Sequence, residues 1–173
     1  LMALKLGAAT RDLKHGPKAS LPTDPETKVD TSIQYQGAIA VNRDGKRFIR
    51  EDKWYGFLSD EGAKQPGGEF YIVYDSAIRE ATKRNFPAWL KHKEYKGETP
   101  EQLAQNLGIS AKGLKEQIEK YNRDVRAGRD TDFERSTLDG NVGSPIPLDK
   151  PPFYGMKCTY SMTSFKGGIR IDP

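Results

Sequence analysis

The 173-residue sequence has a single cysteine, Cys158, and only two histidines, His15 and His92. A lone cysteine excludes an internal disulfide and any site built from several thiolates. Because the few nitrogen and sulfur ligands are scattered along the chain, we expect no zinc or iron centre. Each histidine follows a lysine, and we interpret both as solvated surface residues.

Long apolar runs are also missing. No run approaches the ~18 residues that a membrane-spanning helix needs, and hydrophobic residues make up only 35% of the chain. The net charge is +4, from 28 Lys and Arg against 24 Asp and Glu, which is too small to keep a chain of this composition unfolded. We therefore predict a folded domain with a thin core and long loops, no membrane association and a cytoplasmic location.

Several catalytic and nucleotide-binding motifs are absent. The chain has no Gly-x-Ser-x-Gly elbow, so scattered Ser, His and Asp residues leave a hydrolase triad open without supporting it. The pairs Gly67-Gly68 and Gly167-Gly168 lack the Gly-x-Gly-x-x-Gly spacing with which a helix start meets a pyrophosphate. Lys and Arg alternate with Asp and Glu along most of the chain, so no nucleic-acid partner is expected. By itself, the chain is not expected to hold a dinucleotide.

The patterns that are present predict an α+β fold with a β-hairpin, a short mixed sheet and packed amphipathic helices. Residues 37–51 alternate around the turn residues 42–45, which predicts the hairpin. Aromatic and β-branched residues over 69–74 predict a strand. Residues 2–13 indicate a helix, 52–68 a loop or short helix, 129–152 an irregular segment, and 153–171 an extended one.

Three helices have clear start signals. Asp75 caps a helix predicted to reach Asn85. The sequence Thr99-Pro-Glu-Gln102 is typical of a capping box, and Gly108 ends that helix. Ser110 begins an amphipathic helix that ends before Gly128. Its apolar positions are Leu114, Ile118, Tyr121 and Val125.

The motifs at 37–51 and 153–172 resemble those of one flavoprotein group. It comprises soluble fumarate reductases (flavocytochrome c), succinate dehydrogenase flavoproteins, urocanate reductases and 3-ketosteroid dehydrogenases. The helix pair over 101–122, the segment Gly128 to Arg135, the run Pro152 to Tyr154 and the run Lys166 to Asp172 follow in the order found in that group. The similarity covers about residues 6–172.

This resemblance implies a capping domain over 37–152, a hinge segment over 1–36 that enters it, and a return segment over 153–173. Both ends of the chain read as the interior of structural elements, so we expect a further FAD-binding domain outside this sequence. The cap would close over the flavin, where hydride moves between FAD and a C=C or CH–CH bond. FAD would be held by the complete protein and not by this chain, which is expected to be inactive alone. The expected partners are the protein's own FAD-binding domain and a small-molecule substrate.

The resemblance also implies site residues. Tyr55 aligns with the Arg acid of fumarate reductases, Ser164 and Phe165 replace their His-Thr pair, and Gln34 replaces a relay Arg. Ketosteroid-type members have a Tyr near this position, and a phenol can donate or accept a proton if its surroundings tune it. The substrate is therefore expected to be uncharged and activated by a carbonyl. We predict Tyr55 and Ser164 as catalytic residues and Gly167 and Gly168 as facing the flavin.

The charged residues of these motifs have plainer interpretations. Arg47 and Glu51 are predicted to form a surface ion pair, and Arg135 to belong to a solvated loop network. Arg79, Lys83 and Arg84 fit the solvent face of a helix.

Two other functions stay open from sequence alone. One is a basic module for an anionic partner such as RNA. The other is an interaction domain whose partner-binding patch is formed by Trp54, Tyr55 and Phe57.

Overall fold

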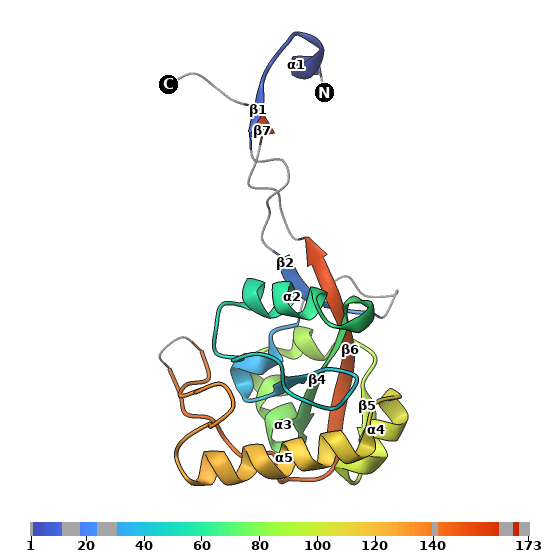
Figure 1. Cartoon of the computed structure of the whole chain (residues 1–173), viewed down its shortest axis with the longest axis vertical. Helices are drawn as coiled ribbons and strands as arrows, with labels where there is room; N and C mark the ends of the chain where they lie inside the picture. Colours follow the sequence, from blue (N-terminus) through green and yellow to red (C-terminus); the bar gives the residue numbers. More distant parts are fainter. Residues whose placement is uncertain (1, 12–17, 24–30, 140–141, 163–167, 170–173) are drawn as a thin grey trace.

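The computed structural model describes residues 2–11, 18–23, 31–139, 142–162 and 168–169. They form an α+β body, with a short pair of strands lying outside it (Figure 1). Every strand pairing in this part of the chain is antiparallel. The α+β class is therefore confirmed, whereas the prediction of a mixed sheet is wrong.

A five-stranded sheet is built around the long strand β6, Phe153–Met162. On one side β6 pairs along its length with β4, Glu69–Asp75, which pairs in turn with β3, Ile39–Val41. On the other side β6 pairs with β5, Tyr95–Gly97, near its start and with β2, Lys18–Pro22, near its end. The strand predicted over 69–74 is confirmed as β4, and the extended return at 153 begins as β6.

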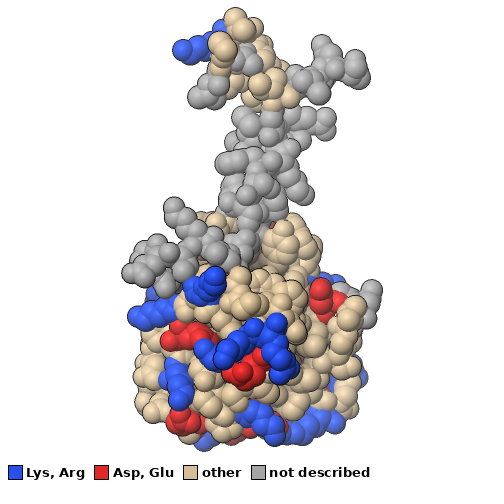
Figure 2. Space-filling model, turned by 180° about the vertical axis from the view of Figure 1, so that it is seen from behind, with Lys and Arg blue, Asp and Glu red and all other residues tan. Residues whose placement is uncertain are grey.

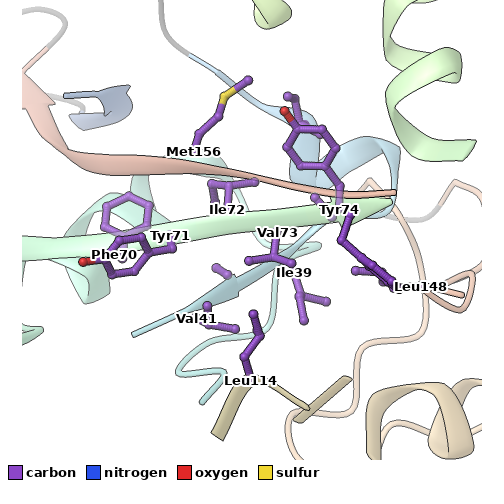
Figure 3. Packing of buried hydrophobic residues seen from close by; sticks show 14 of the residues in the cluster. Ile39, Val41, Phe70, Tyr71, Ile72, Val73, Tyr74, Leu114, Leu148 and Met156 are labelled. Carbon is purple, nitrogen blue, oxygen red and sulfur yellow. The ribbon is translucent and has the colours of Figure 1, made fainter. Parts of the chain in front are cut away.

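The hydrophobic core lies where β3 and β4 meet the helices (Figure 3). Every β4 residue from Phe70 to Asp75 is buried, because apolar groups cover both faces of this strand. On β6, Gly155 faces Leu107, and a Cβ added there would lie 2.7 Å from a Leu107 methyl carbon. The absence of a side chain at Gly155 thus lets the helices pack closely on the sheet.

The three capped helices form as predicted. Asp75 accepts a hydrogen bond from the amide of Ile78 at the start of α3, Ser76–Asn85. Thr99 does the same for α4, Pro100–Leu107, and Ser110 for α5, Ala111–Arg126. The reciprocal half of the capping box differs, because the Gln102 side chain accepts from the amide of Glu98 and not from that of the cap residue.

The predicted hairpin over 37–51 is only half formed. Residues 42–45 do turn, with Gly45 at a φ of 72° and the Asn42 side chain accepting from the amides of Asp44 and Lys46. The return side makes a single bridge, between Val41 and Arg47, and β3 finds its strand partner in β4 instead. The second strand fails because Arg47 turns inward to buried carboxylates, as described below.

The N-terminal region also departs from expectation. The helix predicted over 2–13 is one turn long, α1, Met2–Lys5. It is followed by β1, Thr10–Arg11, which pairs with β7, Gly168–Ile169. These two strands form their own two-stranded sheet, so segments from opposite ends of the chain lie side by side outside the body (Figure 1).

The polar segment after the turn contains the short helix allowed by the sequence, α2, Tyr55–Ala63. This helix packs on β2 and β6, with the Ser59 hydroxyl 3.5 Å from that of Ser20 and Gly62 against the Phe70 ring. The described part of the chain also contains three short 3-10 helices: η1 Ile33–Gln36, η2 Pro66–Gly68 and η3 Pro87–Leu90. In the described part of the chain, no helix is both long and apolar enough to cross a membrane.

Candidate functional site

Three aromatic side chains gather at the start of α2, and we call Trp54, Tyr55 and Phe57 the aromatic surface. The Trp54 ring centroid lies 4.8 Å from that of Tyr55 and 6.3 Å from that of Phe57. Trp54 is 47% and Phe57 56% exposed, whereas Tyr55 is half-buried. A Cβ at Gly56 would lie 2.2 Å from the Trp54 ring, so only glycine allows the indole to lie over this helix start.

Each of the three residues 51–53, just before the aromatic surface, accepts at least one hydrogen bond. Glu51 accepts a hydrogen bond from the amide of Ala40 at 3.2 Å. Asp52 accepts from the amide and hydroxyl of Thr137, and from the Arg50 guanidinium. The carbonyl of Lys53 accepts from the Tyr35 hydroxyl at 3.0 Å. The path of the chain into Tyr55 is thereby determined by contacts with distant segments.

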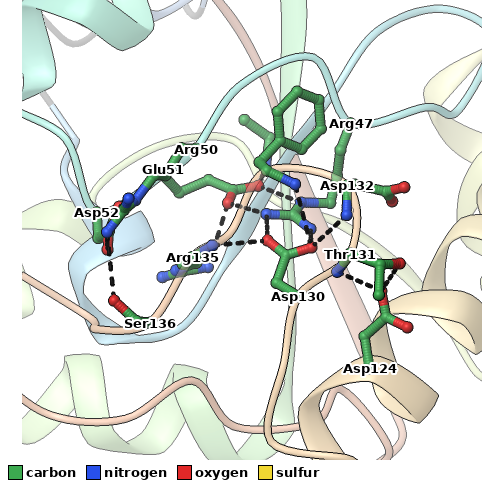
Figure 4. A network of polar contacts seen from close by, with 12 residues as sticks. Arg47, Arg50, Glu51, Asp52, Asp124, Asp130, Thr131, Asp132, Arg135 and Ser136 are labelled. Atoms are coloured by element: carbon green, nitrogen blue, oxygen red, sulfur yellow. Dashed lines mark hydrogen bonds and ion pairs between the residues drawn. The ribbon is translucent and has the colours of Figure 1, made fainter.

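Beneath this segment lies a buried ion cluster formed by Arg47, Glu51, Asp130 and Arg135 (Figure 4). Arg47 donates from Nε and Nη2 to the two oxygens of Glu51, at 2.8 and 2.6 Å. It donates from Nη1 and Nη2 to the two oxygens of Asp130, at 2.9 Å each. Its guanidinium also lies 5.0 Å from the ring centroid of Tyr121 and 5.1 Å from that of Phe133.

Arg135 joins the ion cluster to a different part of the chain. Its guanidinium donates to the carbonyls of Gln34 at 2.7 Å and Ala38 at 3.0 Å, and it lies 3.5 Å from the Glu51 carboxylate. Asp130 in turn accepts from the backbone amides of residues 132, 133 and 135. The ion cluster therefore connects η1, the turn before α2 and the loop after α5.

The predicted ion pair between Arg47 and Glu51 forms, but its surface location is wrong, and so is the prediction of a solvated network around Arg135. The side chains of Arg47, Glu51 and Arg135 have no exposed area and that of Asp130 is 1% exposed. Burial is tolerated because each Arg meets carboxylates and the two positive and two negative charges balance. Burial disfavours the charged form of Arg47, but contacts with Glu51 and Asp130 outweigh it and raise its pKa. The pKa of Asp130 is lowered, because hydrogen bonds from Arg47 outweigh the opposing effect of burial.

Histidine and cysteine make no candidate site. His92 is only 9% exposed, so the prediction of a surface side chain is wrong there, and His15 lies outside the described residues. Burial raises the pKa of the Cys158 thiol, which keeps it protonated and unreactive. Among the residues that the structure describes, no group of His, Cys, Asp and Glu is placed to hold a metal ion.

The structure places only some of the predicted site residues. Tyr55 is the first residue of α2. Gly168 lies in β7, paired with Arg11, so the structure does not bring it together with Tyr55. Ser164 and Gly167 lie outside the described residues. Sequence reasoning missed Tyr35, because nothing in the surrounding Ile-Gln-Tyr-Gln pattern distinguishes it.

A pocket of about 380 Å³ opens beside the ion cluster. Asp130 and Arg135 form part of its wall, together with exposed residues of the loop after α5. Tyr55 is not among the lining residues, which separates this hollow from the aromatic surface. The lining consists of Val125, Gly128, Arg129, Asp130, Glu134, Arg135, Ser136, Ser144 and Pro145.

Surface charges of both signs lie next to one another. Figure 2 shows Lys and Arg beside Asp and Glu on the face opposite to that of Figure 1. Arg79, predicted to be solvated, is instead paired with Glu94 at 2.7 Å and partly covered. On the described part of this face, no large area carries a single sign of charge.

The described residues thus form an antiparallel α+β body with an aromatic surface and a separate pair of strands, β1 and β7. Residues 2–173 match the family described as FAD binding domain, and the chain belongs to this family. FAD is accordingly the cofactor that the family implies.

Individual relatives support the same grouping. The chain is 30% identical to a probable fumarate reductase, Ifc3, of Shewanella frigidimarina, over 99% of this chain and 28% of the relative. It is also 30% identical to a 3-oxosteroid 1-dehydrogenase of Mycobacterium tuberculosis, over 99% of this chain and 36% of the relative. The chain thus spans about a third or less of the length of these relatives.

Among solved structures, the chain resembles the open conformation of a flavocytochrome c3 fumarate reductase. The TM-score is 0.80 with 29% identity, covering 99% of this chain and 29% of that one.

The described residues do not fit a dinucleotide cradle. Such a cradle needs a parallel strand-turn-helix unit, and every described pairing is antiparallel. The starts of α3, α4 and α5 are already occupied by their own cap side chains, and the cap of α3 is the carboxylate of Asp75. Asp75 would repel a pyrophosphate at the start of α3, so these helix starts do not form a dinucleotide cradle.

Proposed function

We propose that this chain is the capping part of a flavin-dependent oxidoreductase, with residues 37–152 as the cap. In this proposal residues 1–36 enter the cap and 153–173 return toward a domain that holds FAD. The observation that carries the proposal is the pairing of β1 with β7. A domain inserted into another must leave it through two neighbouring connections, and strands from both ends of this chain run side by side outside the body (Figure 1).

The aromatic surface supports a closing role. In Figure 1, α2 lies at the end of the body nearest to β1 and β7, where a second domain would meet it. Trp54 and Phe57 are large apolar groups left exposed, and such groups gather where another surface or a ligand binds. Closure over the site would exclude water and strengthen the electrostatic interactions inside.

The proposed reaction moves hydride between FAD and a C=C or CH–CH bond of a carbonyl-activated substrate. Tyr55 would donate the proton that accompanies hydride in reduction, or accept it in the reverse direction, at the carbon next to the activating carbonyl. The relatives include fumarate reductases and a 3-oxosteroid dehydrogenase. A phenol in place of a guanidinium favours the uncharged type of substrate. Ser164 beside the substrate, Gly167 and Gly168 beside the flavin, and a cytoplasmic location belong to the same proposal.

Two measurements test this proposal. The complete gene product should purify with bound flavin, visible in its absorbance spectrum, whereas the 173-residue chain should bind FAD weakly or not at all and show no turnover. Tyr55→Phe in the complete gene product should slow flavin reduction or reoxidation by substrate at least ~100-fold, the usual contribution of a general acid or base, with flavin content unchanged. A complete gene product without flavin would contradict the proposal.

The exposure of Trp54 and Phe57 also favours a second candidate, a domain that only binds another protein through the aromatic surface. The same variant separates the two. If Tyr55→Phe loses rate while assembly is kept, the purely structural function is rejected, and if it loses assembly at unchanged rate, the catalytic role is rejected.

A further inference from the structure

Tyr35 lies between the ion cluster and the aromatic surface. It belongs to η1, whose neighbouring residues Ile33 and Gln34 are fully buried. The Tyr35 hydroxyl donates to the carbonyl of Lys53, in the segment that leads into α2 and two residues before Tyr55. Tyr35 is half-buried and Lys53 is exposed, so this contact lies at the surface of the body.

The start of α2 lacks the usual side-chain cap. The cap residue Trp54 offers no acceptor, and no side-chain hydrogen bond is made there. The first amides of a helix have no partner inside the helix and need one outside it. The carbonyl of Lys53, to which the Tyr35 hydroxyl donates, lies directly before this uncapped start, so Tyr35 holds the chain next to it.

The Tyr35 hydroxyl remains a donor at neutral pH. Burial is the largest effect on this phenol, and the nearby Asp139 adds to it. Together with smaller contributions they outweigh the Tyr55 amide and raise the pKa of Tyr35 to about 12. A phenol that keeps its proton can donate to the Lys53 carbonyl throughout the working range of an enzyme.

The backbone on both sides of Tyr35 is held by hydrogen bonds from Arg135. Arg135, only 2% exposed, donates to the carbonyl of Gln34 on one side of Tyr35 and to that of Ala38 on the other. Arg135 is held in turn against Glu51. A guanidinium with several directional hydrogen bonds has little freedom to move. Arg135 therefore restricts the backbone on both sides of Tyr35, and with it the position of the Tyr35 hydroxyl.

We propose that Tyr35 is a positioning residue for Tyr55, which it orients by holding the Lys53 carbonyl, two residues before Tyr55. This inference rests on the proposed function, in which Tyr55 transfers the proton. Tyr35 touches neither substrate nor flavin in this role. Its effect on the reaction is expected to pass entirely through Tyr55.

A double-mutant cycle in the complete gene product tests the inference. Tyr35→Phe removes one hydroxyl and should lower the rate constant of the substrate half-reaction ~3- to 10-fold, the size of one hydrogen bond. KM should change less than ~2-fold, because ground-state binding is not involved. In a Tyr55→Phe background the same substitution should have no further effect, since the group being positioned is gone.

The outcomes are distinguishable. If Tyr55→Phe leaves the rate unchanged, the proposed catalytic role fails and the inference fails with it. If Tyr55→Phe is slow but Tyr35→Phe is harmless, or costs the same factor in both backgrounds, the inference alone is overturned. Tyr95→Phe, on the distant strand β5, is the matched control and should match the parent enzyme in rate and thermal midpoint. Thermal unfolding of Tyr35→Phe checks that the fold is kept.

Discussion

Arg47 and Asp130, 83 residues apart in the chain, form a two-pronged ion pair in which both hydrogen bonds measure 2.9 Å and neither side chain reaches solvent appreciably. The pair joins the turn before α2 to the loop after α5. Because its partners are buried, removing one leaves the other charged and unsatisfied.

Asp130→Ala should therefore destabilise the chain by ~3–5 kcal/mol, the cost of breaking a buried pair from one side. Urea unfolding followed by circular dichroism measures this free energy. Asp149→Ala is the matched control, because its partner Arg126 is 56% exposed and surface pairs contribute less than ~1 kcal/mol. Equal losses in the two variants would show that the buried pair is not special.

Acid should unfold the chain partly through Asp124. Burial opposes ionisation of this carboxyl, but hydrogen bonds from Lys120 and Thr131 lower its pKa from 3.8 to about 2. A lowered pKa means that the stabilisation is complete above the unfolded value and is lost as pH falls from about 3.8 toward 2. Asp124→Asn should be less stable at neutral pH and lose less stability across that window. The measurement is the urea midpoint of unfolding at a series of pH values. If the midpoint of Asp124→Asn falls between pH 3.8 and about 2 as steeply as that of the parent chain, Asp124 does not contribute to acid unfolding.

The glycine in the turn before Arg47 should tolerate no side chain. Gly45 has a φ of 72°. A Cβ added to Gly45 would lie only 2.3 Å from the backbone nitrogen of Leu114. Gly45→Ala should cost more than ~2 kcal/mol, because the turn must lift away from α5. Gly108→Ala is its control, with a similar φ of 73° and open space, and should cost ~1 kcal/mol for backbone strain alone. Comparable unfolding free energies would mean that the turn is not docked on α5.

Gly56→Ala should reorganise the aromatic surface without unfolding the chain. Its Cβ would meet the Trp54 ring at 2.2 Å, and the half-exposed indole can swing away at little cost. We expect the fluorescence emission spectrum of Trp54 to change. It is recorded in a Trp89→Phe background, so that Trp54 is the one remaining indole. The unfolding midpoint should be unchanged or raised. An unchanged spectrum would mean that the indole does not lie over Gly56.

Local signals predicted the three capped helices α3, α4 and α5 well. Asp75, Thr99 and Ser110 each satisfy an amide at a helix start through contacts within three residues, so neighbouring sequence suffices to identify them. The strand at 69–74 was equally clear, since aromatic and β-branched residues follow one another there. The boundaries of these elements depend little on the rest of the chain.

Long-range contacts explain what local patterns missed. Arg47 sits in an alternating pattern typical of a strand, yet Asp130 and Glu51 draw it inward and leave one bridge where a strand was expected. No sequence pattern reveals that a carboxylate 83 residues away will be buried beside it. Tyr55 emerged as a candidate only through family resemblance, and Tyr35 had no signal, because its role depends on a carbonyl 18 residues further on.

The ribbon of β1 and β7 has a mechanical implication. Each of these strands is hydrogen-bonded to the other and to no further strand in the described part of the chain. Any movement that separates β1 from β7 would have to break these hydrogen bonds, so closure of the proposed cap should carry both strands together.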